Sequence, residues 1–157
     1  MRKRLLLILF GIMLLAACES YDCSLYNYVG MYGAFDRDGD AVRIEDTLTI
    51  TAGKAGPVLL NKSVKTVSIN LPLSYWQDED TLVFSVKGDG YLFVDTVWIQ
   101  KTNEVHYEAP DCPTKLFHTI QSVRNTQEFI KSITVIRSSV NYETTTNLQI
   151  HLLSDSD

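Results

Sequence analysis

The stretch that decides the fold is TLVFSVKGDGYLFVDTVWIQ, residues 81–100. Its first half carries apolar residues at alternate positions (82, 84 and 86), a period of two that is typical of a half-buried β-strand. Gly88-Asp89-Gly90 then forms a turn sequence. The second half, Tyr91–Gln100, is almost continuously apolar, which indicates a central strand buried on both faces. The stretch therefore predicts a long β-hairpin inside a sheet.

Similar patterns recur on both sides of this hairpin. Leu48 and Ile50 alternate with threonines, and Val67, Ile69 and Leu71 are predicted to share one buried face. Residues 125–129 are predicted to hold one helical turn. The other expected strands are 25–35, 42–51, 64–73, 105–107, 116–123, 130–140 and 148–152. Eight or nine short strands between turn signals favour an all-β fold. We expect an antiparallel β-sandwich, immunoglobulin-like or similar, with sheets about 10 Å apart.

The N-terminal segment resembles the signal peptide of a bacterial lipoprotein. Three basic residues precede an apolar run at 5–15, and Leu15-Ala16-Ala17-Cys18 resembles a lipobox, whose thiol accepts the lipid. The run is shorter than the ~20 apolar residues of a membrane-spanning helix. A spanning helix and an ordinary signal peptide with a chance cysteine are the alternatives. The expected organisation is a signal peptide (1–17), a lipidated tether (18–22), a single β-sandwich domain (23–153) and a frayed tail (154–157).

Charge and location narrow the classes of partner. Cleavage before Cys18 would remove three of the 14 basic residues and none of the 19 acidic ones, which changes the net charge from −5 to −8. We therefore expect no nucleic-acid partner, and we interpret the scattered acids as a solvated surface. The expected location is the periplasmic face of the outer membrane. Surface export is associated with an acidic cluster just after the lipidated cysteine, and here only Glu19 and Asp22 represent it. The periplasmic face is therefore favoured, and the cell surface is the alternative.

The three cysteines divide into one lipid anchor and one pair. With Cys18 acylated, Cys23 and Cys112 remain, and in an oxidising compartment a disulfide is the default expectation. The bond would close a loop of roughly 90 residues and contribute about 4 kcal/mol in the chain-entropy treatment. Two free thiols are the alternative.

Few residues carry the signature of a ligand site, and no cofactor is expected. Asp36, Asp38 and Asp40 resemble the start of a calcium loop, but the twelfth position is Thr47 instead of an acid. A hairpin turn at Asp38-Gly39 is the better interpretation. Tyr75 and Trp76 lie in a polar loop, where exposed aromatic rings could stack on sugars; anchoring of the loop is the alternative. Trp98 is expected in the core.

No catalytic motif is assembled locally, and we expect the chain not to be an enzyme. His106, His118 and His151 lack metal-ligand spacing and are expected to be surface or hydrogen-bonded strand residues. No Gly-x-Ser-x-Gly elbow is present. A Ser-His-Asp site assembled from distant positions stays open, because such sites are defined by geometry and not by sequence order.

An Asp-Thr-apolar triplet occurs three times, at Asp46-Thr47-Leu48, Asp80-Thr81-Leu82 and Asp95-Thr96-Val97. The gaps of 34 and 15 residues are unequal, which argues against a structural repeat. We interpret each triplet as the start of a strand. The aspartate bonds local backbone at the end of a turn, and the β-branched threonine begins the strand.

These features together resemble a family of small Bacteroidota lipoproteins with a domain of unknown function. The resemblance rests on the lipobox, on Cys23 and Cys112, and on the strand sequences at 46–50, 71–73 and 80–84. It implies a β-rich exported domain and supplies no catalytic residues. It also implies candidate O-glycosylation sites at Thr47, Thr81 and Thr96, because the triplet is similar to the acceptor motif of general O-glycosylation in Bacteroidota.

The function expected from the sequence is that of a membrane-anchored envelope lipoprotein. It would act as a non-catalytic structural module or bind an envelope protein. The alternative is a glycan-binding module that uses Tyr75 and Trp76.

Overall fold

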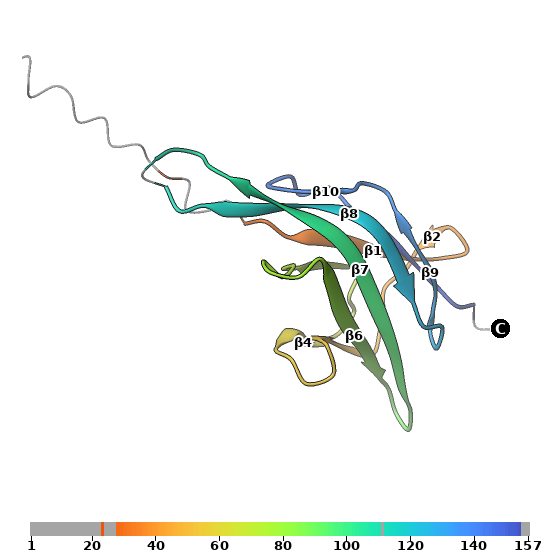
Figure 1. Cartoon of the computed structure of the whole chain (residues 1–157). Coiled ribbons are helices and arrows are strands. Elements are labelled where there is room, and N and C mark those ends of the chain that lie inside the picture. The colour runs from red at the N-terminus through yellow and green to blue at the C-terminus, as the bar shows by residue number, and fades with distance from the viewer. Residues whose placement is uncertain (1–22, 24–27, 111, 155–157) are drawn as a thin grey trace, which may run out of the picture.

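The computed structural model describes residues 23, 28–110 and 112–154, which form two β-sheets (Figure 1). This confirms the predicted all-β fold and is consistent with a sandwich. The described residues contain no helix, and so none that could cross a membrane. The expected signal peptide (1–17), Cys18 with its tether (18–22) and tail residues 155–157 lie outside the described residues.

The described residues contain eleven strands. In chain order they are β1 (Met31–Arg37), β2 (Asp40–Ala41), β3 (Thr47–Ala52), β4 (Val58–Ser63), β5 (Ser68–Leu71), β6 (Glu79–Lys87), β7 (Leu92–His106), β8 (Lys115–Asn125), β9 (Ile130–Val135), β10 (Ser139–Val140) and β11 (Leu148–Leu152). The number exceeds the predicted eight or nine, in part because β2 and β10 have only two residues each.

One sheet has five strands and the other has six. The five-stranded sheet has the order β2-β1-β11-β9, with β5 also paired to β1. The six-stranded sheet has the order β10-β8-β7-β6-β3-β4, and all its pairs are antiparallel. β1 and β11 pair in parallel, which departs from the purely antiparallel arrangement that we predict. The first and last strands of the described chain therefore lie side by side.

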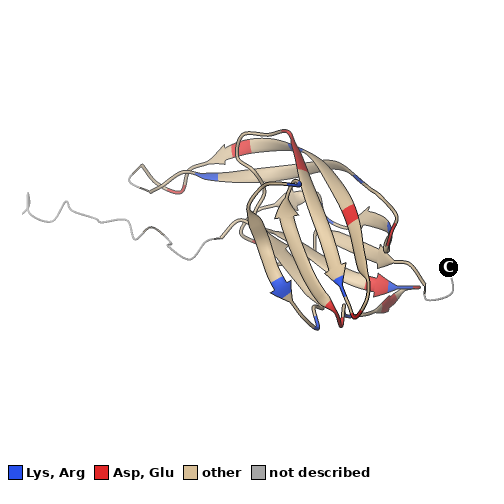
Figure 2. Ribbon diagram, turned by 90° about the horizontal axis from the view of Figure 1, so that it is seen from below, with Lys and Arg blue, Asp and Glu red and all other residues tan. Residues whose placement is uncertain are grey.

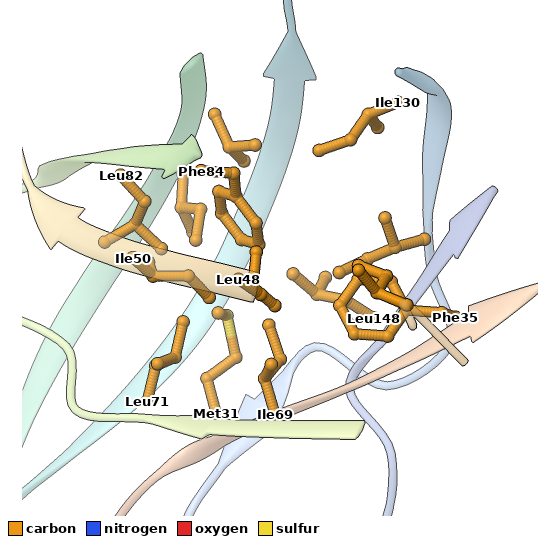
Figure 3. Close-up of a cluster of buried hydrophobic side chains, with 14 of the residues drawn as sticks. Met31, Phe35, Leu48, Ile50, Ile69, Leu71, Leu82, Phe84, Ile130 and Leu148 are labelled. Carbon is orange, nitrogen blue, oxygen red and sulfur yellow. The ribbon is translucent and has the colours of Figure 1, made fainter. Parts of the chain in front are cut away.

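The core lies between the sheets and consists of the alternating residues of their inner faces (Figure 3). Its central side chains are at most 3% exposed: Leu48, Ile50, Leu82 and Phe84 of the six-stranded sheet, and Met31, Phe35, Ile69, Leu71 and Leu148 of the five-stranded sheet. The predicted buried positions 69 and 71 are thus confirmed. Val67 is 60% exposed, contrary to prediction, because β5 begins only at the next residue.

The hairpin of residues 81–100 lies inside the six-stranded sheet, as predicted, and β6 pairs with β7 from Glu79↔Gln100 to Lys87↔Leu92. Its second strand is not buried on both faces, however. Leu92 and Val94 are 60% and 40% exposed because they lie on the outer face of the sheet, which meets solvent. Phe93 lies on the inner face and is 40% exposed near the tip of the hairpin, which extends beyond the opposite sheet (Figure 1). Beyond the tip, only the inner face of β7 is buried, as is usual where one face of an antiparallel sheet meets solvent.

Trp98 lies on the outer face of the six-stranded sheet and not in the core, which corrects the prediction. It pairs with Thr81 and Arg124, whereas the neighbouring Val97 points inward. The guanidinium carbon of Arg124 lies 4.2 Å from the centroid of the Trp98 ring, a cation–π contact.

Residues 130–140 form two strands in different sheets, and not the single strand that we predict. β9 pairs with β11, whereas β10 pairs with β8. The fully buried Asn147 holds this crossing in place. Its Nδ2 donates to the carbonyls of Arg137 and Ser139 at 3.1 and 2.8 Å, and its Oδ1 accepts the N–H of Tyr32 at 3.0 Å. One amide side chain therefore links both sheets.

Two shorter segments also differ from the prediction. Residues 58–63 form the edge strand β4, which we do not predict. Its half-buried and exposed residues do not alternate, and its pairing with β3 has two register shifts, so the sequence lacks the period of two that indicates a strand. Residues 126–129 connect β8 to β9 without a helical turn. The predicted hairpin at Asp38-Gly39 is confirmed, because Arg37 pairs with Asp40 and both turn residues have positive φ (53° and 92°), as a type I′ turn requires.

Acidic and basic residues are dispersed among the strands and their connections (Figure 2). The interpretation of all acids as solvated is nevertheless wrong for three of them. Asp36, Asp80 and Asp95 are at most 6% exposed, and Lys101 is buried as well at 1%. Buried charges need hydrogen-bonding partners, and Asp80 and Lys101 find theirs in the connection between β5 and β6.

Candidate functional site

The two aromatic residues predicted to contact a ligand lie on the surface of one connection. We call residues 72–78, between β5 and β6, the aromatic loop; within it Tyr75 is 56% and Trp76 is 92% exposed. Tyr28 lies nearby, since burial and the neighbouring phenols of Tyr32 and Tyr75 raise the pKa of Tyr28. An almost fully exposed side chain is unusual for tryptophan, which is highly buried on average.

Lys101 on β7 holds the aromatic loop from beneath. Its side chain is completely buried, and Nζ donates to the carbonyl oxygens of Ser74 at 2.7 Å and Gln77 at 2.6 Å. The third N–H of the ammonium goes to Oδ1 of Asn103 at 2.7 Å. An ammonium has three donors, so these bonds use all of them and fix the loop on both sides of Tyr75 and Trp76.

Asn103 and His118 support the lysine in turn. Asn103 Nδ2 donates to the Gln77 carbonyl at 3.2 Å, which leaves Oδ1 as the acceptor for Lys101 and for His118 Nδ1 at 2.8 Å. His118 is 3% exposed. Burial and the charge of Lys101 lower the pKa of His118 to about 4, although Asp80 opposes this shift. The ring is therefore neutral at pH 7 and donates its Nδ1–H to Asn103.

Asp80 completes the support from the start of β6. Its two carboxylate oxygens lie 3.1 and 3.3 Å from the backbone N of Ser74, and one of them lies 3.6 Å from Lys101 Nζ. The backbone N–H of Lys101 donates to the Asp78 carbonyl at 2.7 Å. Both ends of the aromatic loop are thus bonded to the six-stranded sheet.

A cleft of about 550 Å³ opens beside the aromatic loop. Its walls come from the turn after β3, from the loop itself and from the start of β6. They are formed by Ala52, Gly53, Pro57, Leu59, Pro72, Leu73, Ser74, Trp76, Gln77, Asp80, Thr81 and Leu82. The Ser74 hydroxyl oxygen is buried, and no described residue hydrogen-bonds to it. The volume falls within the ~300–1,000 Å³ typical of small-molecule sites.

The three Asp-Thr-apolar triplets place their threonines on one surface. Thr47, Thr81 and Thr96 pair with Lys87, Trp98 and Val83 on the outer face of the six-stranded sheet, and all three are half-buried. Thr47 is the first residue of β3, as the strand-start interpretation predicts. Thr96 lies in the middle of β7, so that interpretation is wrong for the third triplet.

The aspartates of the first and third triplets bond to partners far away in sequence, whereas Asp80 of the second accepts the N–H of Ser74 in the preceding loop, as the local-backbone interpretation predicts. Asp46 accepts a hydrogen bond from the Tyr91 hydroxyl. Asp95 is fully buried, and its Oδ1 accepts from Thr126 Oγ1 at 2.6 Å and from the N–H of Glu128 at 2.9 Å. Its Oδ2 accepts the N–H groups of the next two residues at 2.8 and 2.7 Å. Asp95 therefore shapes the connection where we predict a helical turn.

The aspartates of the proposed calcium loop do not converge. Asp36 Oδ1 lies 2.7 Å from His151 Nδ1, and Asp38 accepts a hydrogen bond from the Ser154 hydroxyl at 2.8 Å. Within the part of the chain that the structure describes, no three His, Cys, Asp or Glu side chains are grouped as metal ligands. The Asp38-Gly39 segment thus has the geometry of a hairpin turn.

His151 is the histidine whose partners most resemble a catalytic arrangement. Its Nδ1 faces Asp36 and its Nε2 lies 2.9 Å from Thr134 Oγ1, so the three residues follow the order of a nucleophile, base and carboxylate. They lie on three neighbouring strands, and none of them lines either of the two cavities described here. Because none of the three residues lines either cavity, we interpret the row as a cross-strand hydrogen-bond ladder.

The second cavity, of about 540 Å³, lies near the tip of the β6–β7 hairpin and includes Tyr91 and Phe93. Its walls carry both signs of charge, with Arg43 and Glu45 paired to each other. This mixture selects no single ligand chemistry.

The predicted disulfide joins Cys23 to Cys112 across 89 residues, with their Cα atoms 5.4 Å apart. Cys112 lies at the end of a protruding arm, which we call the β7–β8 arm and define as residues 101–110 and 112–120 (Figure 1). On this arm His106 stacks on Phe117 at 4.2 Å between ring centroids, and Tyr142 meets both rings edge-on. The bond therefore ties the start of the described chain to the arm.

Tyr75 and Trp76 could be found from sequence, because aromatic residues in a polar loop stand out. Lys101, Asn103 and His118, which hold that loop, carry no such signal. Each is a polar residue in a β-like stretch, and such a residue normally indicates the solvent face of a strand.

Residues 47–152 match the model of a family of unknown function, DUF6452. The match covers about two thirds of the chain, from the first residue of β3 to the last residue of β11, and includes the aromatic loop and Lys101. A search of the curated proteins and a search of the solved structures gave no match.

Proposed function

We propose that this protein, which belongs to the DUF6452 family of unknown function, is a lipoprotein of the bacterial envelope. Cys18 carries the lipid, and the β-sandwich stands at the periplasmic face of the outer membrane of a Bacteroidota cell. There it serves as a non-catalytic structural module or binds an envelope protein. The basic start, the apolar run and the lipobox of residues 2–18 support this assignment.

The observation that carries the proposal is the disulfide between Cys23 and Cys112. Stable disulfides are typical of proteins outside the cytoplasm, and this bond leaves Cys18 as the third cysteine of the chain. Cys23 follows Cys18 by five positions, and this length of chain spans at most about 18 Å when extended. A lipid on Cys18 would therefore hold the β7–β8 arm close to the membrane, so partners would be membrane-proximal.

The N-terminal peptide of the protein purified from native membranes tests the anchor. Mass spectrometry should find a peptide that begins at Cys18 and carries the mass of the acyl groups. An unmodified N-terminus at any other residue would overturn the proposal. Digestion of intact cells with an external protease tests the leaflet, because cleavage would place the domain at the cell surface instead.

O-glycosylation of Thr47, Thr81 or Thr96 is part of this proposal. All three hydroxyls belong to the outer face of one sheet, so a single exposed surface would carry the glycans. The intact mass of native protein should exceed the sum of polypeptide and lipid. Replacing the three threonines with valine should remove the excess, and a native mass equal to polypeptide plus lipid would rule the modification out.

A second candidate function is glycan binding at the aromatic loop. It is favoured by the 92% exposure of Trp76 on a loop that Lys101 holds in place beside a cleft. Oligosaccharides should then quench or shift the tryptophan fluorescence of the protein. A flat response across a broad panel of glycans would count against this function.

A further inference from the structure

We infer that the cleft beside the aromatic loop binds a neutral pyranose unit of a glycan and disfavours acidic sugars. The inference rests on the second function proposed above and deepens it by naming the class of sugar. It follows from the exposed indole of Trp76, from the charges of the cleft and from the Ser74 hydroxyl, which lacks a hydrogen-bond partner among the described residues.

Trp76 supplies the apolar surface that a sugar ring needs. The C–H face of a pyranose packs on an aromatic ring, and the indole of Trp76 is 92% exposed at the wall of the cleft. Because Lys101 bonds the carbonyls of Ser74 and Gln77, the backbone around the indole is fixed before any ligand arrives. Binding then costs little ordering of the loop, which favours measurable affinity from a single platform.

The charges of the cleft favour an uncharged ligand. Asp80 is the only charged side chain among the residues that line it. Lys101, the nearest cation that supports the loop, lies below the surface with all three donors already used. Asp80 is paired with Lys101, so the cleft carries no net positive charge, and its lining residues include no cation that could bind the carboxylate of an acidic sugar. The loss of hydration of that carboxylate in the cleft would therefore be uncompensated. Hydroxyl groups, by contrast, can donate to Asp80 and exchange hydrogen bonds with Gln77 and Thr81.

Ser74 gives an independent indication of a polar ligand. Its hydroxyl is buried at the cleft and lacks a hydrogen-bond partner among the described residues. Leaving a buried hydroxyl unpaired is unfavourable, so such groups tend to mark places where water or a ligand belongs. The oxygen is closed off from solvent, so the Ser74 side chain would have to rotate before a sugar hydroxyl in the cleft could supply the missing partner.

Calorimetric titration of the full chain tests the inference. The protein is kept in a zwitterionic detergent, because sugar-headed detergents would compete. The probes are neutral oligosaccharides of glucose, mannose and N-acetylglucosamine, and matched oligosaccharides of glucuronic and galacturonic acid. We expect at least one neutral series to bind, and its acidic counterpart to bind at least tenfold more weakly at low salt.

Two variants locate the site. Trp76→Ala should weaken binding of the neutral sugar at least tenfold. Tyr107→Ala is the matched control, because Tyr107 is another exposed aromatic residue (68%) outside the aromatic loop, and it should leave the affinity within twofold of wild type. Equal losses in the two variants would show that the cleft is not the site.

The outcomes separate this inference from the function on which it rests. Equal or tighter binding of acidic sugars would overturn the preference for neutral sugars but leave glycan binding intact. No binding of any glycan would overturn both. A response to unglycosylated peptides alone would assign the platform to a protein partner and overturn the inference as well.

Discussion

At the scale of single residues, Asp95 is a fully buried acid that fixes the connection between β8 and β9. Its buried carboxylate accepts four hydrogen bonds from residues 126–130, between β8 and β9. In Asp95→Asn, an amide N–H would face two of these donors. We expect the free energy of unfolding, measured by urea denaturation, to fall by about 3 kcal/mol, since the lost bonds involve a charged acceptor.

Asp89→Asn is the matched control for this change. Asp89 is exposed in the turn between β6 and β7, and its replacement should change the free energy of unfolding by less than about 0.5 kcal/mol. Similar small effects in both variants would mean that Asp95 does not stabilise the β8–β9 connection.

His118 makes stability depend on pH. Its burial, together with the charge of Lys101, lowers its pKa to about 4, whereas a histidine in an unfolded chain has a pKa near 6.5. Between these values the unfolded state binds a proton that the folded state does not. Stability therefore falls as pH decreases from about 6.5 towards 4, with a slope of at most about 1.4 kcal/mol per pH unit.

Comparison with His118→Gln isolates this contribution. The glutamine amide can still donate to Asn103 Oδ1 but does not titrate, while all carboxylates of the protein remain. Urea denaturation at pH 7, 6 and 5 should show wild type losing stability relative to the variant. Parallel pH curves for the two proteins would contradict the assigned role of His118.

At the scale of elements, the aromatic loop keeps its conformation because β7 places Lys101 beneath it. Lys101→Met fills similar volume but removes the ammonium donor of the Ser74 and Gln77 carbonyls and the ion-pair partner of the Asp80 carboxylate. We expect a loss of about 3 kcal/mol in the free energy of unfolding, as for other buried charges deprived of a partner. We also expect chymotrypsin to cleave after Tyr75 or Trp76 under native conditions, where wild type resists.

Lys87→Met controls for the change of charge, since Lys87 is exposed at the end of β6. Circular dichroism before digestion shows whether Lys101→Met retains its sheets. A folded Lys101→Met protein that resists chymotrypsin as well as the control would refute the role of Lys101 in fixing the loop.

Elements that depend on local sequence could be predicted, and those that depend on distant partners could not. The Gly88-Asp89-Gly90 and Asp38-Gly39 turns are encoded by adjacent residues, so both hairpins are found from sequence. The parallel pairing of β1 with β11 joins residues more than 100 positions apart and leaves no local pattern. The split of residues 130–140 likewise depends on Asn147, which contacts both sheets.

The same distinction applies to the candidate site. The position of Tyr75 and Trp76 follows from an aromatic pair in a polar stretch. The burial of Lys101, by contrast, depends on carbonyls about 25 residues earlier in the chain. The exposure of Leu92, Phe93 and Val94 could not be predicted for a related reason. Three consecutive apolar residues indicate burial on both faces, and the sequence does not reveal that the outer face of this sheet is uncovered.

At the scale of the whole molecule, β7 connects the candidate site to the disulfide. Lys101 fixes the aromatic loop near the middle of the strand, and Cys112 follows the end of the strand on the β7–β8 arm. If Cys18 carries a lipid, the membrane is linked covalently through Cys18 and the Cys23–Cys112 disulfide to the β7–β8 arm, whose base holds Lys101. The cleft would then be held at a restricted height above the membrane, which suits a ligand or partner near that surface.

Reduction of the disulfide tests this arrangement, because it separates folding stability from membrane attachment. Opening a loop closed across 89 residues should lower the free energy of unfolding by about 4 kcal/mol in the chain-entropy treatment, and the Cys23→Ser, Cys112→Ser double variant should reproduce the loss. Under the proposed anchor, dithiothreitol should leave the protein in the membrane fraction, since a thioether at Cys18 is not reducible, whereas detergent should release it. Release of the protein by dithiothreitol alone would mean that a disulfide, and not a lipid on Cys18, holds it at the membrane.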